Sequence, residues 1–240
     1  NKIEIVNSKN FIFSIKKTLK KKKVKSESSP TPNDIALVLH TSGTTSRPKM
    51  VPLSHKNLLK SCENITKALK IKETDKNIIL MPSFHIHGIV ASILAPLYKG
   101  SKVVALPKFN VLSFYNFLDK HNPTWFTAVP TMLQSIVDRS RSNKEIIKRN
   151  KLRFIRSSSA SLPAPTLSGI ENIFNVPVIE SYGMTEASHQ MTTNLLPPYK
   201  RKIGSVGVPI GLNVKIVSSE FKNLNANQIG EVVIKGQNVI

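Results

Sequence analysis

The sequence predicts an α/β protein in which a mostly parallel sheet is flanked by helices, followed by the start of a small β-barrel-like subdomain. From residue 35 to residue 180, short apolar runs typical of strands alternate with segments of helical periodicity. This rhythm favours parallel strands with helices on both faces. Beyond residue 203, strand-like runs follow one another with turns but no helix between them, which is typical of an antiparallel or barrel unit.

Three segments are predicted along the chain. Residues 1–33 form a basic lead and linker, whose end is polar and holds two prolines. Residues 34–202 form the α/β core, and residues 203–240 begin the β subdomain and stop within it. With 240 residues, 40% of them hydrophobic, the chain is long enough to bury a sizeable core.

The first half of the core begins with the run IALVLH, residues 35–40, which predicts a buried strand. A polar turn over residues 41–48 follows. The pattern further predicts a strand over residues 77–81, a buried helix over 88–97 and a strand over 102–106. Between residues 48 and 77, Ser54 is the predicted N-cap of a helix whose apolar face is formed by Leu58, Cys62, Ile65 and Leu69.

The second half of the core repeats the alternation. Apolar residues at helical spacing predict helices near residues 111–118, 133–137 and 167–174. Between these helices, the runs TWFTA, LRFIR and PVIE predict strands over residues 124–128, 152–156 and 177–180. In the last segment, VKIV and EVVIK predict strands over residues 214–217 and 231–235.

Charge is the unusual feature of the composition, with 35 Lys and Arg against 14 Asp and Glu and a net charge of +21. The basic residues gather in residues 1–25, 139–156 and 200–202, with few aromatic residues among them. We therefore interpret them as solvated faces rather than a nucleic-acid surface. A basic nucleic-acid-binding module is an alternative, and it predicts binding that weakens steeply with salt.

The cysteine and hydropathy patterns exclude several classes of protein. A single cysteine, Cys62, cannot support a disulfide scaffold or a cysteine-rich zinc module, and it fits an intracellular location, cytoplasmic or peroxisomal. The longest apolar stretch, residues 89–98, is too short to cross a bilayer, and residues 1–10 lack the pattern of a secretory signal. We predict no membrane span, and the oligomeric state stays open.

A polar loop rich in Ser and Thr, HTSGTTSRPK, follows the first predicted strand. Its backbone N–H groups, its hydroxyl groups and the Lys49 ammonium provide the donors and positive charge that a polyphosphate requires. The loop lacks the Walker A spacing. A Ser/Thr-rich stretch by itself is often no more than a turn, so composition alone leaves both interpretations open.

Three further segments place polar side chains near the ends of predicted strands. His85 and His87 lie in FHIHG, and on a strand their spacing directs both imidazoles to one face, as in the wall of a shared pocket. A zinc site there lacks a third ligand. Glu186, in SYGMTEASH, offers a carboxylate that suits Mg²⁺ beside phosphates. Residues 156–161, RSSSAS, form a polar loop after a strand.

Together these segments resemble the adenylate-forming superfamily, which contains acyl-CoA synthetases, luciferases and peptide-synthetase adenylation domains. The Ser/Thr-rich loop matches the phosphate-binding signature of that family at Thr41–Thr45, Pro48 and Lys49, and it departs from the signature at Ser46 and Met50. SYGMTE resembles the Y-G-x-T-E motif of the family, FHIHG its P-x-F-H segment, and RSSSASLP its S-G-x-x-P-L loop. The resemblance covers residues 35–240 and implies that residues 34–202 are an AMP-binding core.

The resemblance implies a role for each matched position. The loop would bind the β- and γ-phosphates of ATP, Tyr182 would pack against the adenine, and Glu186 would hold Mg²⁺. The implied catalytic residues are Lys49, His85, Thr185 and Glu186. The implied ATP-binding residues are Thr41, Ser42, Gly43, Thr44, Thr45, Lys49, Ala160, Ser161, Glu180, Ser181, Tyr182, Gly183 and Thr185.

By the same resemblance, the acid pocket would be lined by His85, His87, Ser159 and His189. Apolar acids require apolar walls, whereas imidazoles and hydroxyls suit a small acid whose second carboxylate requires donors around it. The combination looks most like the oxalate–CoA ligase branch, with ATP, Mg²⁺ and coenzyme A. A 4-coumarate- or fatty-acid-type CoA ligase and a non-catalytic ATP-binding remnant are the alternatives.

The implied reaction has two half-reactions. Oxalate attacks the α-phosphorus of MgATP to give oxalyl-adenylate and pyrophosphate, and the thiol of coenzyme A then displaces AMP to give oxalyl-CoA. The ribose-binding aspartate, the hinge and the small C-terminal domain of the family have no counterpart in the matched segments. These 240 residues alone are therefore expected to be weakly active or inactive.

Overall fold

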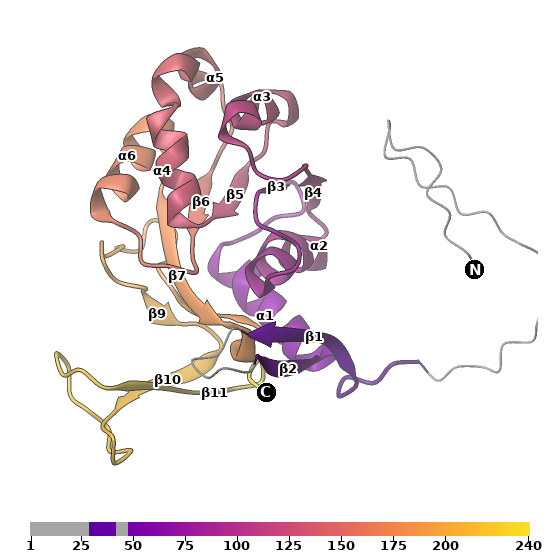
Figure 1. Ribbon diagram of the computed structural model, residues 1–240, viewed down its shortest axis with the longest axis vertical. Coiled ribbons are helices and arrows are strands. Elements are labelled where there is room, and N and C mark those ends of the chain that lie inside the picture. Colours follow the sequence, from indigo (N-terminus) through magenta and orange to yellow (C-terminus); the bar gives the residue numbers. More distant parts are fainter. Residues whose placement is uncertain (1–28, 42–47) are drawn as a thin grey trace, which may run out of the picture. The chain divides into compact units, whose positions relative to one another are not determined.

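A computed structural model describes residues 29–41 and 48–240 of the chain. Most of the predicted basic lead, residues 1–28, and the loop residues 42–47 lie outside the described residues. The elements described below belong to one unit, Pro32–Ile240 (Figure 1).

The main sheet has seven strands in the order β4–β3–β5–β6–β7–β8–β9. Neighbouring strands from β4 to β7 are parallel, and β8 and β9 extend the β7 edge in antiparallel orientation. This arrangement confirms the predicted α/β class with a mostly parallel sheet. The strands span β3 (Lys76–Ile79), β4 (Lys102–Ala105), β5 (Trp125–Ala128), β6 (Phe154–Ser157), β7 (Val178–Met184), β8 (His189–Thr193) and β9 (Val208–Pro209).

Helices cover both faces of the parallel strands (Figure 1). One face carries α1 (His55–Ala68), η1 (His87–Leu94) and α2 (Ala95–Tyr98), and the other carries α3 (Val111–His121), α4 (Pro130–Asp138) and α6 (Ala164–Phe174). The short helices are η2 (Ser140–Asn143), α5 (Lys144–Lys148) and η3 (Thr185–Ala187). None of the helices in the described ranges has the length and apolar character to cross a lipid bilayer.

Strand alternation sorts the buried side chains into two cores. Trp125 and Phe154 pack with α1 and η1, whereas their successors Phe126 and Ile155 pack with α3, α4 and α6. Because side chains alternate along a strand, the next residues on the α1 face are Thr127 and Arg156, which are register partners in β5 and β6. The apolar core on this face is therefore followed by polar residues toward the carboxyl ends of the strands.

The predicted start of α1 is confirmed, because the Ser54 hydroxyl accepts a hydrogen bond from Asn57 N at 3.2 Å. The expected apolar face is also present, with Cys62 and Ile65 buried. Ser54 ends a strand that the sequence analysis missed, β2 (Lys49–Ser54).

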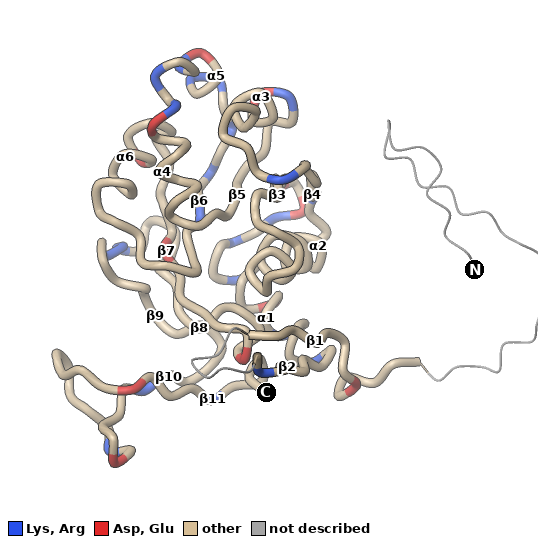
Figure 2. The backbone as a smooth tube through the Cα atoms, in the orientation of Figure 1, with Lys and Arg blue, Asp and Glu red and all other residues tan. Residues whose placement is uncertain are grey.

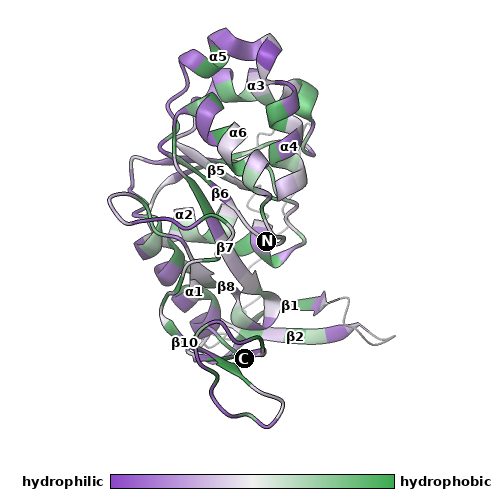
Figure 3. Cartoon of the chain, turned by 90° about the vertical axis from the view of Figure 1, so that its left-hand side faces the viewer, coloured by the Kyte–Doolittle hydropathy of each residue, from purple (hydrophilic) through white to green (hydrophobic). Residues whose placement is uncertain are grey.

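The prediction of a buried strand over residues 35–40 was wrong in its burial. Within the part of the chain that the structure describes, β1 (Ile35–Thr41) pairs only with β2, as an antiparallel hairpin apart from the main sheet. Leu37 and Leu39 are half-buried, whereas Ile35 and Val38 are 55% and 44% exposed. Both strands carry hydrophobic and hydrophilic residues (Figure 3). An unbroken apolar run does not distinguish a strand buried on both faces from a strand of a hairpin.

The placement of the two FHIHG histidines on a strand was also wrong. His85 lies in an exposed turn and His87 begins η1, a π-helix that occupies the first part of the predicted helix 88–97. Gly88 permits this close turn, since a Cβ there would lie 2.0 Å from the carbonyl oxygen of Pro82. The imidazoles therefore do not form one wall of a pocket.

β7 is longer than predicted. The SYGM motif was expected to follow this strand, but it lies within the strand. The backbones of β7 and β8 approach so closely that a Cβ on Gly183 would lie 1.6 Å from the carbonyl oxygen of His189. Farther along, β10 (Leu212–Val217) and β11 (Glu231–Gly236) pair antiparallel, which confirms the two predicted strands.

Basic residues from Arg139 to Lys151 are exposed around η2 and α5, as expected of solvated faces (Figure 2). The expectation was wrong at the end of this cluster. Arg156 is completely buried in β6.

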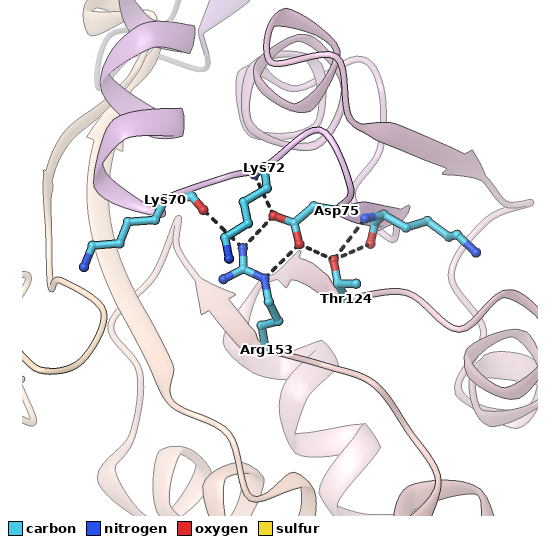
Figure 4. A network of polar contacts seen from close by, with 6 residues as sticks. Lys70, Lys72, Asp75, Thr124 and Arg153 are labelled. Carbon is cyan, nitrogen blue, oxygen red and sulfur yellow. Dashed lines mark hydrogen bonds and ion pairs between the residues drawn. The ribbon is translucent and has the colours of Figure 1, made fainter.

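At the amino ends of β3, β5 and β6, Asp75 binds Arg153 through two hydrogen bonds of 2.8 and 2.6 Å (Figure 4). Asp75 also accepts hydrogen bonds from Lys72 N at 2.8 Å and from the Thr124 hydroxyl at 2.7 Å. Burial by itself raises the pKa of Asp75, but the hydrogen bonds from Arg153, Lys72 and Thr124 outweigh it and lower the pKa below its ordinary value. This network joins three segments of the fold.

Candidate functional site

Several predicted site residues come together where β5, β6 and β7 end. In open α/β sheets, ligands bind outside the carboxyl ends of the strands. The loop after β6, the start of η1 and the β7–β8 hairpin all reach this edge. Their polar side chains form a group that we call the polar cluster, comprising His87, Thr127, Arg156, Ser159, His189 and Gln190.

His87 is the link between three elements. Its Nδ1 lies 2.9 Å from the Ser159 hydroxyl, and its Nε2 lies 2.6 Å from the Thr127 hydroxyl. The ring stacks on His189, with centroids 4.8 Å apart and an interplanar angle of 16°. Three of the four residues predicted for the acid pocket therefore meet here, and the fourth, exposed His85, does not.

Arg156 lies behind the two imidazoles and is 0% exposed. Its Nη2 is 3.0 Å from His189 Nε2 and 3.2 Å from Gln190 Oε1, and its Nη1 is 3.2 Å from the Thr127 hydroxyl. Its Nε has no hydrogen-bond partner among residues 29–41 and 48–240. No ion pair to Arg156 exists within the described residues.

The protonation states of the polar cluster follow from burial. Desolvation, followed by the charge of Arg156, lowers the pKa of His87 and the pKa of His189 well below 6.5. Burial lowers the pKa of Arg156 to about 9. At pH 7 the polar cluster therefore contains two neutral imidazoles and one guanidinium ion.

The backbone of the polar cluster is held in an unusual conformation. Ser159, Ser188 and His189 have φ values of +74°, +51° and +96°. Residues other than glycine rarely adopt this left-handed region. Backbone strain of this kind is frequent at functional sites. The conformation of His189 accompanies the close β7–β8 approach at Gly183.

The other predicted nucleotide residues lie in the loop after β6 and on β7. Ala160 and Ser161 are exposed in the loop after β6, and Tyr182 is 40% exposed on β7. Glu180 and Ser181 are buried with structural partners: Glu180 Oε1 accepts from Leu162 N at 2.9 Å, and the Ser181 hydroxyl lies 2.9 Å from the Thr193 hydroxyl. These bonds fix the loop and the hairpin at this edge.

The predicted phosphate and metal residues are only partly described. Thr41 and Lys49 face one another at the end of the β1–β2 hairpin, and Lys49 is exposed. Ser42, Gly43, Thr44 and Thr45 lie outside the described residues. Thr185 and Glu186 open η3 and are half-buried, and Glu186 forms no ion pair in the part of the chain that the structure describes.

Arg156, Thr127 and Gln190 were not among the site residues predicted from the sequence. A signal for Arg156 was present, because LRFIR places it two residues after Phe154, on the same buried face of a predicted strand. An arginine on a buried face requires partners. Arg156 was instead interpreted as part of the exposed basic cluster over residues 139–156.

Comparison with known proteins identifies the family. A family model described as AMP-binding enzyme matches residues 3–240. An oxalate–CoA ligase of Arabidopsis thaliana is 47% identical over 211 residues, covering 87% of this chain and 41% of the relative. An oxalate–CoA ligase of Saccharomyces cerevisiae is 42% identical over 207 residues, covering 86% of this chain and 37% of the relative.

Solved structures of CoA ligases share the fold. A malonyl-CoA ligase in a ternary complex with methylmalonyl-CoA and AMP matches with a TM-score of 0.79 and 31% identity, covering 89% of this chain and 46% of that one. The o-succinylbenzoate coenzyme A synthetase of Bacillus subtilis, in complex with ATP and a magnesium ion, matches with a TM-score of 0.77 and 30% identity, covering 88% and 43%.

The chain thus spans about two fifths of the length of the curated relatives it matches, at 41% and 37%. The family model nevertheless matches almost the whole chain. The chain belongs to the AMP-binding enzyme family.

Proposed function

We propose that this chain carries the acid- and ATP-binding residues of an AMP-forming acid–CoA ligase, and that its acid is oxalate. The observation that carries the proposal is the polar cluster, in which His87, Ser159 and His189 converge at the carboxyl edge of the sheet. The two relatives named oxalate–CoA ligases support the same acid.

The chemistry of the polar cluster suits a small dicarboxylate. One carboxylate of oxalate is the nucleophile toward the α-phosphorus of ATP, and the other must be held without competing for that role. The N–H of a neutral His189 imidazole and the Ser159 hydroxyl can donate hydrogen bonds to the second carboxylate, and His87 bonds to Ser159. An apolar acyl chain would leave these donors without acceptors, at a cost in binding free energy.

ATP would lie along the exposed residues of the same edge. We propose that Lys49 and the hydroxyls of the Ser/Thr-rich loop bind the β- and γ-phosphates, that Thr185 contacts the α-phosphate, and that Tyr182 packs on the adenine. The contribution of these groups is to align the carboxylate with the α-phosphorus and to neutralise the charge of the departing pyrophosphate.

Glu186 fits the requirement for a Mg²⁺ ligand. Mg²⁺ in nucleotide sites takes one or two protein carboxylates and completes its shell with phosphate oxygens and water, and Glu186 is half-buried without an ion pair in the described ranges. When bound, the ion would neutralise phosphate oxygens. The related synthetase that was solved with ATP and a magnesium ion supports this proposal.

The test is acid-dependent exchange of labelled pyrophosphate into ATP, measured on the complete protein with oxalate, malonate, 4-coumarate and a fatty acid. We expect exchange with oxalate above all others and its loss in His87→Ala and His189→Ala. Exchange that is greatest with 4-coumarate or the fatty acid would contradict the proposal. ATP binding with no exchange for any acid would favour a non-catalytic remnant.

One observation favours a second candidate, a ligase for an apolar acid. A cavity of about 670 Å³ lies at the ends of β3 and β4 and is lined mainly by apolar residues, including Leu80, Met81, Phe84 and Met132. If an acyl chain binds there, pyrophosphate exchange should be greatest with the fatty acid or with 4-coumarate. The same panel of acids tests this.

A further inference from the structure

Arg156 is a buried cation whose hydrogen-bond partners are all neutral. It bonds to Thr127, His87, His189 and Gln190, and no carboxylate of the described residues pairs with it. A buried charge without a counter-charge is unfavourable. Its location beside a candidate substrate site points to a ligand that brings the opposite charge.

The direction of each hydrogen bond follows from the chemistry of arginine, which donates and never accepts. His189 Nε2, at 3.0 Å from Nη2, must therefore accept, so the proton of neutral His189 is on Nδ1. His87 Nε2, at 3.3 Å from Nη1, must likewise accept. The Thr127 hydroxyl, which accepts from Nη1 at 3.2 Å, therefore donates its own hydrogen to His87 Nε2 at 2.6 Å.

The series of hydrogen bonds from Arg156 through Thr127 continues through His87 to the surface. With Nε2 accepting, the proton of neutral His87 is on Nδ1 and is donated to the Ser159 oxygen at 2.9 Å. The hydroxyl hydrogen of Ser159, an exposed residue, is then directed away from the polar cluster. The order of donation is Arg156 to Thr127, Thr127 to His87, and His87 to Ser159.

We propose that Arg156 is the positioning residue of the acid site: it holds His87 and His189 as Nδ1–H tautomers and supplies the counter-charge for the second carboxylate of a dianionic acid. The proposal deepens the proposed function and rests on it. In this arrangement the His189 Nδ1–H and the Ser159 hydroxyl are the donors left for the acid, and His87 orients Ser159. The charge of the acid offsets the buried guanidinium. A monocarboxylic acid of the same size leaves that charge unmatched.

The test combines kinetics with a direct measurement of tautomers in the complete protein. We expect Arg156→Met to raise the KM for oxalate ~100-fold or more while the KM for ATP changes less than about twofold, because the lost group serves only the acid. Arg156→Lys restores part of the loss. The matched control is Arg153→Met, the same substitution three residues earlier, for which the KM for oxalate is unchanged.

The second readout does not depend on turnover. ¹⁵N spectra of the histidine rings report which nitrogen carries the proton, and we expect Nδ1–H for both rings in the native protein. Thr127→Val, which removes one hydroxyl from the chain of donors, should change the His87 signals and leave those of His189 in place. If Arg156→Met does not fold, Thr127→Val still tests the proposed order of hydrogen-bond donation.

The outcomes separate the two proposals. If the native protein does not activate oxalate but both rings are Nδ1–H and depend on Arg156 and Thr127, the acid assignment fails and the positioning role stands. If oxalate is activated but the KM for oxalate is the same in Arg156→Met, or either native ring is Nε2–H, the role of Arg156 is overturned.

Discussion

Two arginines three residues apart, at opposite ends of β6, have opposite surroundings. Arg153, at the amino end, meets the carboxylate of Asp75 in a two-point ion pair (Figure 4). Arg156, toward the carboxyl end, is fully buried among neutral partners, and its Nε has none. The first pair is complete within the fold, whereas the second cation lacks a counter-charge in the described part of the chain.

We interpret the difference as a division of roles. The completed pair at the amino edge stabilises the fold, and we propose that the unmatched cation at the carboxyl edge serves ligand binding. Removing one member of a completed pair leaves the other charge unsatisfied and costs stability. Removing an unmatched buried cation relieves an unfavourable charge and costs binding instead. The comparison therefore predicts that changes at the amino edge affect folding and changes at the carboxyl edge affect activity.

The largest expected effect is at Glu186. Glu186→Gln keeps the size of the side chain and removes the charge proposed to bind Mg²⁺, so we expect acid-dependent pyrophosphate exchange to fall ~1,000-fold, with unfolding unchanged. Exchange at saturating ATP and Mg²⁺ is the measurement. Activity within threefold of the native protein would remove Glu186 from the site.

At the amino edge, Asp75→Ala is expected to lower the free energy of unfolding by about 3 kcal/mol, because Arg153 loses its counter-charge and Lys72 N loses its acceptor. Partial exposure of Arg153 keeps this value at the low end of the range for buried pairs. Denaturant unfolding measures the loss. Pyrophosphate exchange per folded molecule should not change. A specific loss of exchange with oxalate would contradict the assignment of separate roles to the amino and carboxyl edges.

The pH dependence of stability gives a smaller effect with a defined sign. His87 and His189 stay neutral in the fold, since burial and Arg156 lower their pKa values well below 6.5. The unfolded chain binds protons at these residues below pH 6.5, so the free energy of unfolding falls as pH falls from 7 to 5. Each histidine contributes up to about 2 kcal/mol to that loss.

His87→Gln and His189→Gln test this directly, because each should flatten the decline between pH 7 and pH 5. His121 and Asp75 titrate alike in the native and variant proteins, so their contributions cancel in the difference. A variant whose decline equals that of the native protein would show that the substituted imidazole is charged in the fold.

Most of the sheet was predictable because its signals are local. The runs TWFTA, LRFIR and PVIE are too short and too rich in apolar residues for surface helices, and they form β5, β6 and β7. The same logic failed for IALVLH, where an apolar run belongs to a half-exposed hairpin. Which strand partners a segment finds is decided by distant residues.

The site was predictable as far as its motifs extend. His87, Ser159 and His189 were assigned together and do lie together, whereas His85 was assigned with them and lies in an exposed turn. Arg156, Thr127 and Gln190 were not found, because their importance arises from register across β5, β6 and β8. Spacing along one segment does not contain that information.

Whether a ligand supplies the counter-charge of Arg156 can be measured as the free energy of unfolding of Arg156→Met in the complete protein, with and without oxalate and a non-hydrolysable ATP analogue. Without ligand, we predict a variant at least as stable as the native protein, since an unmatched buried charge has been removed. Oxalate should stabilise the native protein and not the variant. A variant destabilised by about 3 kcal/mol, as expected for Asp75→Ala, and stabilised by oxalate as much as the native protein, would contradict the account.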